Sequence, residues 1–167
     1  IELVQLTHSI PEMQAMAIFE AALNVEKDGV TAIPEIEIPL VGNVKEFLHQ
    51  KEIIQGVAKK LGVKGKVEYK IGTMVEVPRA CVVAAELAKE VQFISFGTND
   101  LTQTTLGFSR DDAGRFIKDY LDKGILETDP FVSIDRKGVG VLMKMCVDSA
   151  RTANPKINIG ICGEHGG

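Results

Sequence analysis

Residues that could bind a metal ion or transfer a proton stand where the sequence predicts strands to end. Glu76 closes the segment GTMVE, Asn99 and Asp100 follow FISFGT, and Cys162 follows INIGI. Carboxylate and amide oxygens are the ligands that Mg²⁺ prefers, and a well-placed thiol can donate a proton. Brought to one place, such side chains could hold a metal-bound ligand and protonate it.

Each of these residues also has a simpler interpretation. Glu76 could be a partly exposed residue at the start of a helix that begins at Pro78, and Asp100 could be a turn or N-cap residue. Cys162 could be a small packed side chain, as free cysteines commonly are. A carboxylate at the end of an apolar strand is costly to bury unless it is paired or bound to metal, so the two carboxylates together favour a Mg²⁺ or Mn²⁺ site.

The histidines and arginines give weaker signals. His8 and His49 are expected at the surface, whereas His165 follows a strand end but has no partner that spacing identifies. Arg79 and Arg110 could each pair with an anion or form ordinary salt bridges at helix ends. We assign no role to any of the five.

Strands and helices alternate along the chain. Short β-branched segments bracketed by Pro or Gly predict strands, whereas apolar residues at helical spacing predict helices, the first of them opened by a capping box at Ser9 and Glu12. The predicted strands span residues 33–42, 66–77 and 92–97, with a fourth and its exit loop in 157–167. The predicted helices span 9–25, 44–61, 78–90, 111–123 and 135–153, with a long polar connection after residue 97.

This alternation indicates a parallel α/β sheet, because each helix must return the chain to the same end of the sheet. Two architectures fit, a (β/α)8 TIM barrel and an open doubly wound sheet. Four strands cannot close a barrel of eight, so in the first case residues 1–167 are expected to be about half of one barrel domain, cut at both ends. In both architectures ligands bind at the carboxyl ends of the strands, which are expected to bring Val41–Gly42, Glu76, Asn99–Asp100 and Cys162–His165 to one rim.

Composition restricts the class of protein. A chain of 167 residues with 45% hydrophobic and 25% charged residues is typical of a soluble globular domain. It has no stretch near the roughly 18 apolar residues of a membrane span and no secretory signal, so no membrane partner is expected and the predicted location is the cytoplasm, or an organelle if a transit peptide lies upstream. A net charge of -4 with scattered basic residues argues against nucleic acid as a partner. Three cysteines without a CxxC pair indicate neither disulfides nor zinc, and Cys81 and Cys146 are assigned to packing.

The same segments resemble the barrel domain of the phosphoenolpyruvate-utilising enzymes. FISFGTNDLTQTTLGFSR, with GTMVEVPRA upstream and GICGEHGG downstream, gives the likeness, which runs over essentially all 167 residues. GFSRDD, DPF and GEHGG favour the branch that uses ATP and phosphate together with pyruvate. The alternatives are the barrel of phosphoenolpyruvate synthase or of enzyme I of the sugar phosphotransferase system, and a non-catalytic βα domain.

The resemblance implies a role for individual residues. Glu76 and Asp100 match the carboxylates that bind the divalent metal, Mg²⁺ with Mn²⁺ as the alternative, and that thereby contact the substrate. Cys162 matches the general acid that protonates carbon 3 of the pyruvate enolate. The loop that holds phosphoenolpyruvate or pyruvate, largely through backbone N–H groups and an amide side chain, corresponds to Gly97, Thr98 and Asn99.

The resemblance also implies a reaction and partners. ATP, phosphate and pyruvate would give AMP, diphosphate and phosphoenolpyruvate, by way of a phosphohistidine on a separate swivelling domain of the same parent chain. The full protein would be a homodimer, for which helix faces such as 111–123 could serve. The phosphorylated histidine, the ATP-binding domain and the arginines of earlier barrel strands have no match in these residues, and His8 does not fit the phosphohistidine motif. The chain alone is therefore expected to be inactive.

Overall fold

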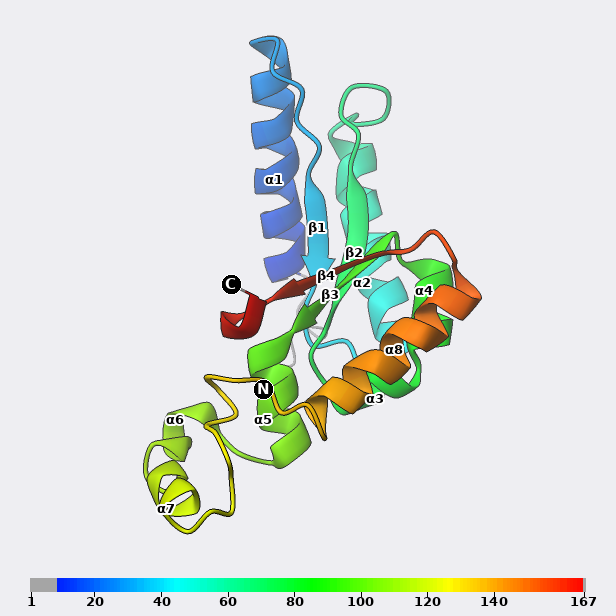
Figure 1. Cartoon of the computed structure of the whole chain (residues 1–167). Helices are drawn as coiled ribbons and strands as arrows, with labels where there is room; N and C mark the ends of the chain where they lie inside the picture. Colours follow the sequence, from blue (N-terminus) through cyan, green and yellow to red (C-terminus); the bar gives the residue numbers. More distant parts are fainter. Residues whose placement is uncertain (1–8, 167) are drawn as a thin grey trace.

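The computed structural model describes residues 9–166, which form a parallel α/β sheet (Figure 1). The strands are β1 (Glu35–Ile38), β2 (Lys70–Val75), β3 (Phe93–Gly97) and β4 (Asn158–Cys162). They are hydrogen-bonded in the order β1-β2-β3-β4, and every pairing is parallel. The parallel sheet predicted from the sequence is confirmed, although the first three strands are shorter than predicted.

Helices alternate with the strands, beginning with α1 before β1. They are α1 (Ser9–Lys27), α2 (Val44–Lys60), α3 (Pro78–Val82), α4 (Ala84–Glu90), α5 (Thr98–Leu106), α6 (Arg110–Ala113), α7 (Ile117–Asp122), α8 (Val139–Ala153) and the 3₁₀ helix η2 (Glu164–Gly166). Asn43 and Glu46 form a capping box at the start of α2, and Gly62 follows its end with a φ of 63°. None of the helices described is both long enough and apolar enough to cross a membrane.

The segment after β3 differs from the prediction of a long polar connection. Thr98 begins α5 directly at the strand end, and Gly107 ends it in the left-handed conformation, with a φ of 67°. Asp100 is therefore in the first helical turn and is neither a turn residue nor the N-cap, which is Gly97. Leu101 is buried in the core, which supports a helix that local sequence preferences did not indicate.

Three predicted helices also have different bounds. The predicted helix 78–90 is divided at Val83 into α3 and α4, and the predicted helix 111–123 is divided into α6 and α7. The predicted helix 135–153 begins four residues later, because the Asp135 carboxylate accepts the backbone N–H groups of Lys137 and Val139 in the turn before α8.

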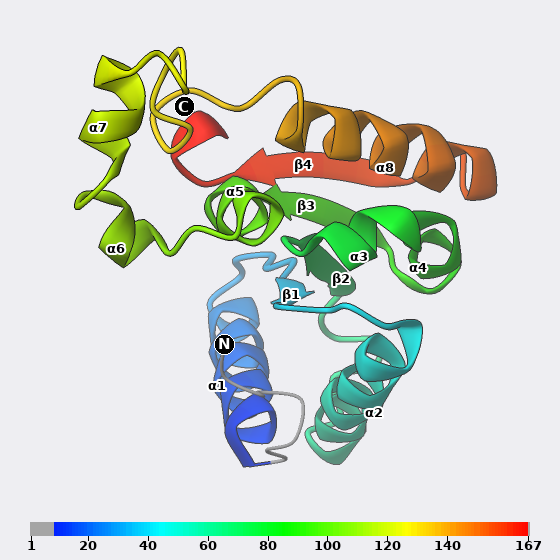
Figure 2. The same ribbon diagram turned by 90° about the horizontal axis from the view of Figure 1, so that it is seen from below.

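One face of the sheet packs on helices. Figure 2 shows α8, then α3 with α4, then α2 following one another along the sheet from β4 to β1. The strand residues that contribute to this core alternate along the chain and are Ile36, Ile38, Ile71, Val75, Ile94 and Phe96. The opposite face has small, polar or sulfur-bearing residues at the intervening positions, among them Glu37, Met74, Ser95, Gly97 and Cys162.

Residues 108–131, here called the α6–α7 lobe, lie beyond the carboxyl end of β3 and stand apart from the sheet (Figures 1 and 2). The lobe has an apolar cluster of its own, in which Ala113, Ile117 and Phe131 are buried. Phe108 and Phe116 form an edge-to-face pair with ring centroids 4.9 Å apart. Because this cluster is separate from the sheet core, the position of the lobe depends on its contacts with the rim.

Candidate active site

The structure places the predicted site residues at one end of the sheet. Glu76 follows β2, Gly97 ends β3, and Cys162 ends β4 directly beside Gly97. Asn99 and Asp100 lie in the first turn of α5, which begins at the same edge. This edge is the rim that the sequence predicted, and the roles of the residues on it stay predictions.

The residues after β1 also lie at this edge, next to the residues that follow β2. Val41 is buried, and the N–H of Gly42 donates to Glu46 within the start of α2. The guanidinium of Arg79 donates to the Gly42 carbonyl, so this arginine stabilises the loop after β1. These residues have structural contacts, and we assign them no part in the chemistry.

Glu76 is a buried carboxylate, and few hydrogen bonds compensate its loss of contact with water. Its side chain is 6% exposed, and its Oε1 accepts one hydrogen bond, of 2.7 Å, from the backbone N–H of Leu40. Burial raises the pKa of Glu76, the hydrogen bond from Leu40 lowers it, and the nearby charges of Asp100 and Glu37 raise it again. A group with these surroundings gains most from a cation placed next to it.

Gly97 allows the Glu76 side chain to lie against β3. A Cβ atom on residue 97 would stand 2.6 Å from Oε2 of Glu76 and 2.9 Å from its Cβ. A side chain at this position would therefore displace the carboxylate. The glycine is required by the close approach of Glu76.

Asp100 completes a pair of carboxylates. Its side chain is within hydrogen-bonding reach of Glu76, and its Oδ1 accepts a bond of 2.7 Å from the amide of Gln103. Within residues 9–166, no lysine, arginine or histidine forms a salt bridge with either carboxylate. Two adjacent carboxylates without a basic partner fit a hard divalent cation such as Mg²⁺ or Mn²⁺. No third Asp, Glu, His or Cys among the described residues joins them, so substrate and water would supply the remaining ligands.

The N-terminus of α5 favours an anion, whereas the two carboxylates favour a cation. No side chain caps this helix, so the backbone N–H groups of its first turn point toward the rim without a side-chain acceptor. Such an end of a helix favours anions. A cation held by Glu76 and Asp100 beside an anion held by α5 would satisfy both groups at once.

Cys162 is half-buried at the end of β4, unlike the other two cysteines. Its Sγ lies 3.4 Å from the carbonyl oxygen of Phe96 and 3.5 Å from the sulfur of Met74. Cys81 and Cys146 are fully buried on α3 and α8, and their assignment to packing is confirmed. The hydrogen bond between those two thiols, together with burial, raises the pKa of Cys146, which stays a neutral thiol.

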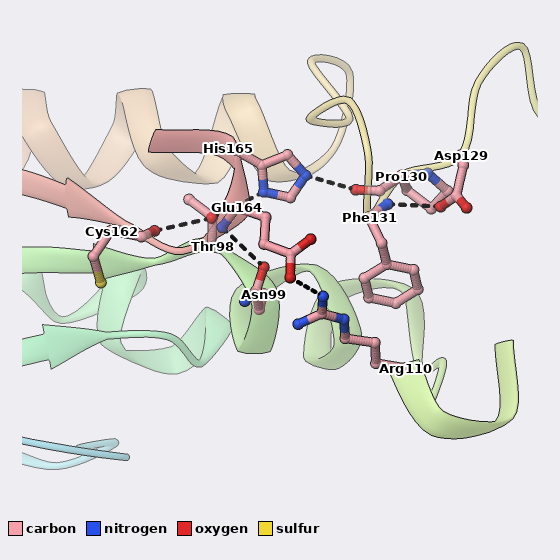
Figure 3. Close-up of polar contacts among 9 residues, drawn as sticks. All are labelled: Thr98, Asn99, Arg110, Asp129, Pro130, Phe131, Cys162, Glu164 and His165. Atoms are coloured by element: carbon pink, nitrogen blue, oxygen red, sulfur yellow. Dashed lines mark hydrogen bonds and ion pairs between the residues drawn. The ribbon is translucent and has the colours of Figure 1, made fainter. Parts of the chain in front are cut away.

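Several residues of the rim were missed or left without a partner at the level of sequence (Figure 3). Arg110 forms an ion pair with Glu164, and the ring of His165 contacts both Thr98 and Pro130. No spacing rule could find contacts that join residues 35 to 67 positions apart. His49 is exposed, as expected, and His8 lies outside the described residues.

Met74 and Gln103 could have been found from the sequence. Met74 stands two residues before Glu76, so strand alternation puts it on the same face as that carboxylate. Gln103 stands three residues after Asp100, which is contact spacing once α5 is recognised as a helix.

Comparison with known proteins gives consistent matches. Residues 1–167 match the family described as PEP-utilising enzyme, PEP-binding domain. The chain is 57% identical over 160 residues to pyruvate, phosphate dikinase 1, chloroplastic, of Arabidopsis thaliana, covering 95% of the chain and 17% of that protein. It is 55% identical over 160 residues to the chloroplastic enzyme of Flaveria trinervia, covering 95% and 17%, and 54% identical over 160 residues to pyruvate, phosphate dikinase 2 of Zea mays, covering 95% and 18%. The chain thus spans less than a fifth of the length of these relatives.

Proposed function

The chain belongs to the PEP-binding domain family of the PEP-utilising enzymes. We propose that its rim binds phosphoenolpyruvate and pyruvate and catalyses phosphoryl transfer between a phosphohistidine and the enolate of pyruvate. The observation that supports this most directly is that Glu76 and Asp100 are neighbouring carboxylates that form no salt bridge with a basic residue among those described. They lie beside the start of α5, which no side chain caps. The relatives' names favour pyruvate, phosphate dikinase as the whole protein, with ATP, phosphate and pyruvate giving AMP, diphosphate and phosphoenolpyruvate.

Glu76 and Asp100 would hold Mg²⁺, or Mn²⁺ in its place. When bound, the metal would neutralise the negative charge of the phosphoryl group and the enolate oxygen. The backbone N–H groups of Gly97, Thr98 and Asn99 would bind the anionic substrate. The side-chain oxygen of Asn99 faces the N–H of Glu164 at 3.4 Å, which leaves its NH₂ group to donate to the ligand.

Cys162 would perform the proton transfer at carbon 3. Toward phosphoenolpyruvate, its thiolate takes a proton from the methyl group of pyruvate, and the enolate oxygen then forms a bond to phosphorus as the N–P bond of the phosphohistidine breaks. In the reverse direction the P–O bond of phosphoenolpyruvate would break as the histidine nitrogen bonds to phosphorus, and the enolate would receive the thiol proton at carbon 3. The half-buried position of the sulfur at the end of β4, beside Gly97, supports this assignment.

The architecture and partners of the whole protein form part of the proposal. Four parallel βα units with the site at their carboxyl ends are compatible with half of a (β/α)8 barrel, residues 1–167 contributing one part of that domain. The phosphohistidine would come from a swivelling domain of the same parent chain, and the full protein would be a homodimer. Diphosphate production would separate this enzyme from a phosphoenolpyruvate synthase or an enzyme I of the sugar phosphotransferase system.

The test uses the full-length protein that contains these residues. Deuterium exchange at the methyl group of pyruvate is followed with Mg²⁺ in the wild type and in Cys162→Ala, alongside phosphoryl transfer from phosphoenolpyruvate to the protein's histidine. We expect the variant to lose exchange and to keep phosphoryl transfer. Equal exchange by both proteins would show that another group moves the proton.

A further inference from the structure

His165 joins three segments at the rim that are distant in the sequence (Figure 3). Its Nδ1 lies 2.9 Å from the hydroxyl of Thr98, and its Nε2 lies 3.0 Å from the carbonyl oxygen of Pro130 in the α6–α7 lobe. The same Thr98 hydroxyl lies 3.0 Å from the carbonyl oxygen of Cys162. These contacts therefore place the lobe, His165, Thr98 and Cys162 next to one another.

The direction of these bonds follows from counting protons. The carbonyl of Cys162 can only accept, so the Thr98 hydroxyl donates to it. The hydroxyl has a single proton, so the bond between Thr98 and Nδ1 forms at the same time only if Nδ1 also donates. With its ring proton on Nδ1, His165 donates to Thr98 while Thr98 donates to Cys162, and Nε2 then only contacts the Pro130 carbonyl.

Thr98 has no other use for its side chain. The residue is fully buried, and its hydroxyl is committed to contacts within the protein, so only its backbone is available to a ligand. A Cβ on Gly163 would stand 2.6 Å from the Thr98 hydroxyl, and the φ of Gly163 is 93°. The turn after Cys162 is thus built closely around Thr98.

We propose that His165 is a positioning residue, which holds the Thr98 hydroxyl and through it the Cys162 backbone in place for proton transfer at carbon 3. This inference rests on the proposed function of Cys162. The hydrogen bond from Thr98 restrains the last residue of β4 just before Gly163, which has a φ of 93°. Without His165 the hydroxyl can rotate and the thiol loses a fixed distance to its substrate.

The Pro130 carbonyl of the lobe contacts the other side of the ring. Pro130 is buried, and the Asp129 carboxylate accepts the N–H of Phe131 at 2.8 Å in the same turn, which holds the Pro130 carbonyl toward His165. Phe131 is buried in the apolar cluster of the lobe. The ion pair between Arg110 and Glu164 is a second contact between the lobe and the segment after β4.

The experiment compares three variants of the full-length protein, with deuterium exchange at the pyruvate methyl group as the readout. Thr98→Val removes the hydroxyl but keeps the shape. His165→Gln puts an amide near the Nε2 position and none near Nδ1, whereas His165→Asn puts one near Nδ1, where it reaches Thr98. His49→Gln, on the exposed face of α2, is the matched control.

We expect exchange to fall about tenfold in Thr98→Val and in His165→Gln, with the KM for pyruvate unchanged, because one hydrogen bond is worth about a factor of ten at most. His165→Asn should stay within about threefold of the wild type. The double variant Thr98→Val/His165→Gln should be no slower than the slower single variant, since both changes break one chain of bonds.

Three outcomes would overturn the inference: unchanged exchange in His165→Gln, losses that multiply in the double variant, or equal losses in the Gln and Asn variants that follow their melting temperatures. Cys162→Ala separates the proposed proton transfer by Cys162 from the proposed positioning role of His165. If Cys162→Ala exchanges normally, the proposed function of Cys162 is wrong. If it does not exchange but His165→Gln does, only the positioning role is wrong.

Discussion

Glu76 combines burial with negative neighbours, and this combination sets the electrostatics of the rim. A carboxylate that loses water needs several hydrogen bonds or a cation, and Glu76 has one backbone donor, Leu40, and the like charge of Asp100. The pKa of Glu76 is raised as a result, first by burial and then by these charges. Such a site costs stability without metal and gains it with metal.

The pH dependence of stability should show this cost. Because the folded pKa of Glu76 lies above its unfolded value, the folded form is favoured fully below the unfolded pKa, and this advantage is lost as pH rises through the folded pKa. In EDTA, Glu76→Gln should therefore be more stable than the wild type at pH 7 and lose that margin below about pH 4. Adding Mg²⁺ should stabilise the wild type and not the variant.

Thermal unfolding of the full-length protein between pH 4 and pH 8, with and without Mg²⁺, measures both effects. Glu20→Gln, an exposed change on α1, is the control and should show neither. A wild type that is more stable than Glu76→Gln at pH 7 in EDTA would contradict the prediction.

Gly97→Ala should disturb the same carboxylate by contact. The new methyl group would stand 2.6 Å from Oε2 of Glu76, so the pair with Asp100 must open. We expect a loss of about 1–3 kcal/mol in the free energy of unfolding and weaker Mn²⁺ binding, measured by denaturant titration and by paramagnetic relaxation of water. Gly56→Ala is the matched control, because nothing lies within 4 Å of its new methyl group inside α2, and it should stabilise by about 0.5–1 kcal/mol.

At the scale of elements, the sheet and α2 could be predicted from the sequence, whereas α5 could not. β-branched runs bracketed by Pro and Gly indicated the strands, and the apolar spacing of α2 with Gly62 indicated its extent. α5 is nine residues of mostly Thr, Asn and Asp, which favour turns and caps. Its stability comes from tertiary burial of Leu101, which no local pattern shows.

The site divides in the same way. The carboxyl ends of parallel strands must meet, so the rim with Glu76, Asp100 and Cys162 followed from topology alone. The contacts of His165 and Arg110 depend on how the α6–α7 lobe folds back onto η2, which has no signature in the sequence. They could be found only in three dimensions.

Gln103 links α5 to α6 and should control Asp100. Its amide N–H donates to Asp100, and its oxygen accepts the backbone N–H of Arg110 at 2.6 Å. Gln103→Leu removes both bonds, and we expect Mg²⁺ affinity to fall by about 10- to 100-fold, as when other partners of metal ligands are lost. Gln103→Glu keeps the acceptor for the N–H of Arg110 but repels Asp100. A comparable loss of Mg²⁺ affinity in both variants, measured by isothermal titration calorimetry, would assign the effect to Asp100. Retained Mg²⁺ affinity in Gln103→Leu would contradict the prediction.

At the scale of the whole molecule, residues 1–167 contain the residues proposed to bind phosphoenolpyruvate and pyruvate, which take part in only one half of the proposed reaction. The histidine that would be phosphorylated and the residues that would bind ATP have no match in this sequence. We therefore expect the isolated chain to show no conversion of phosphoenolpyruvate to pyruvate with Mg²⁺ present, in a coupled assay that detects pyruvate. Measurable turnover by the pure chain would show that the rim needs no further residues.

The isolated chain should also associate through the open side of β1. A groove of about 460 Å³ between α1, β1 and α2 is lined largely by apolar side chains, including Ile18, Ile36 and Ile54. β1 is one of the two edge strands of the sheet described, with β4 the other, and its outer side has hydrogen-bonding groups without a neighbouring strand. Apolar surface next to a free strand edge favours pairing between copies. We expect sedimentation velocity of residues 1–167 to show oligomers whose fraction rises with concentration.

A charge introduced into the groove distinguishes association through the groove from non-specific aggregation. Ile18 is 37% exposed at the groove, so Ile18→Lys should reduce the oligomer fraction several-fold without unfolding α1. Val132, next to the α6–α7 lobe, is 78% exposed and does not line the groove, and Val132→Lys should leave association unchanged. If both variants associate like the wild type, the contact lies elsewhere, and if the wild type is a stable monomer, four βα units with this edge are sufficient as a folded unit.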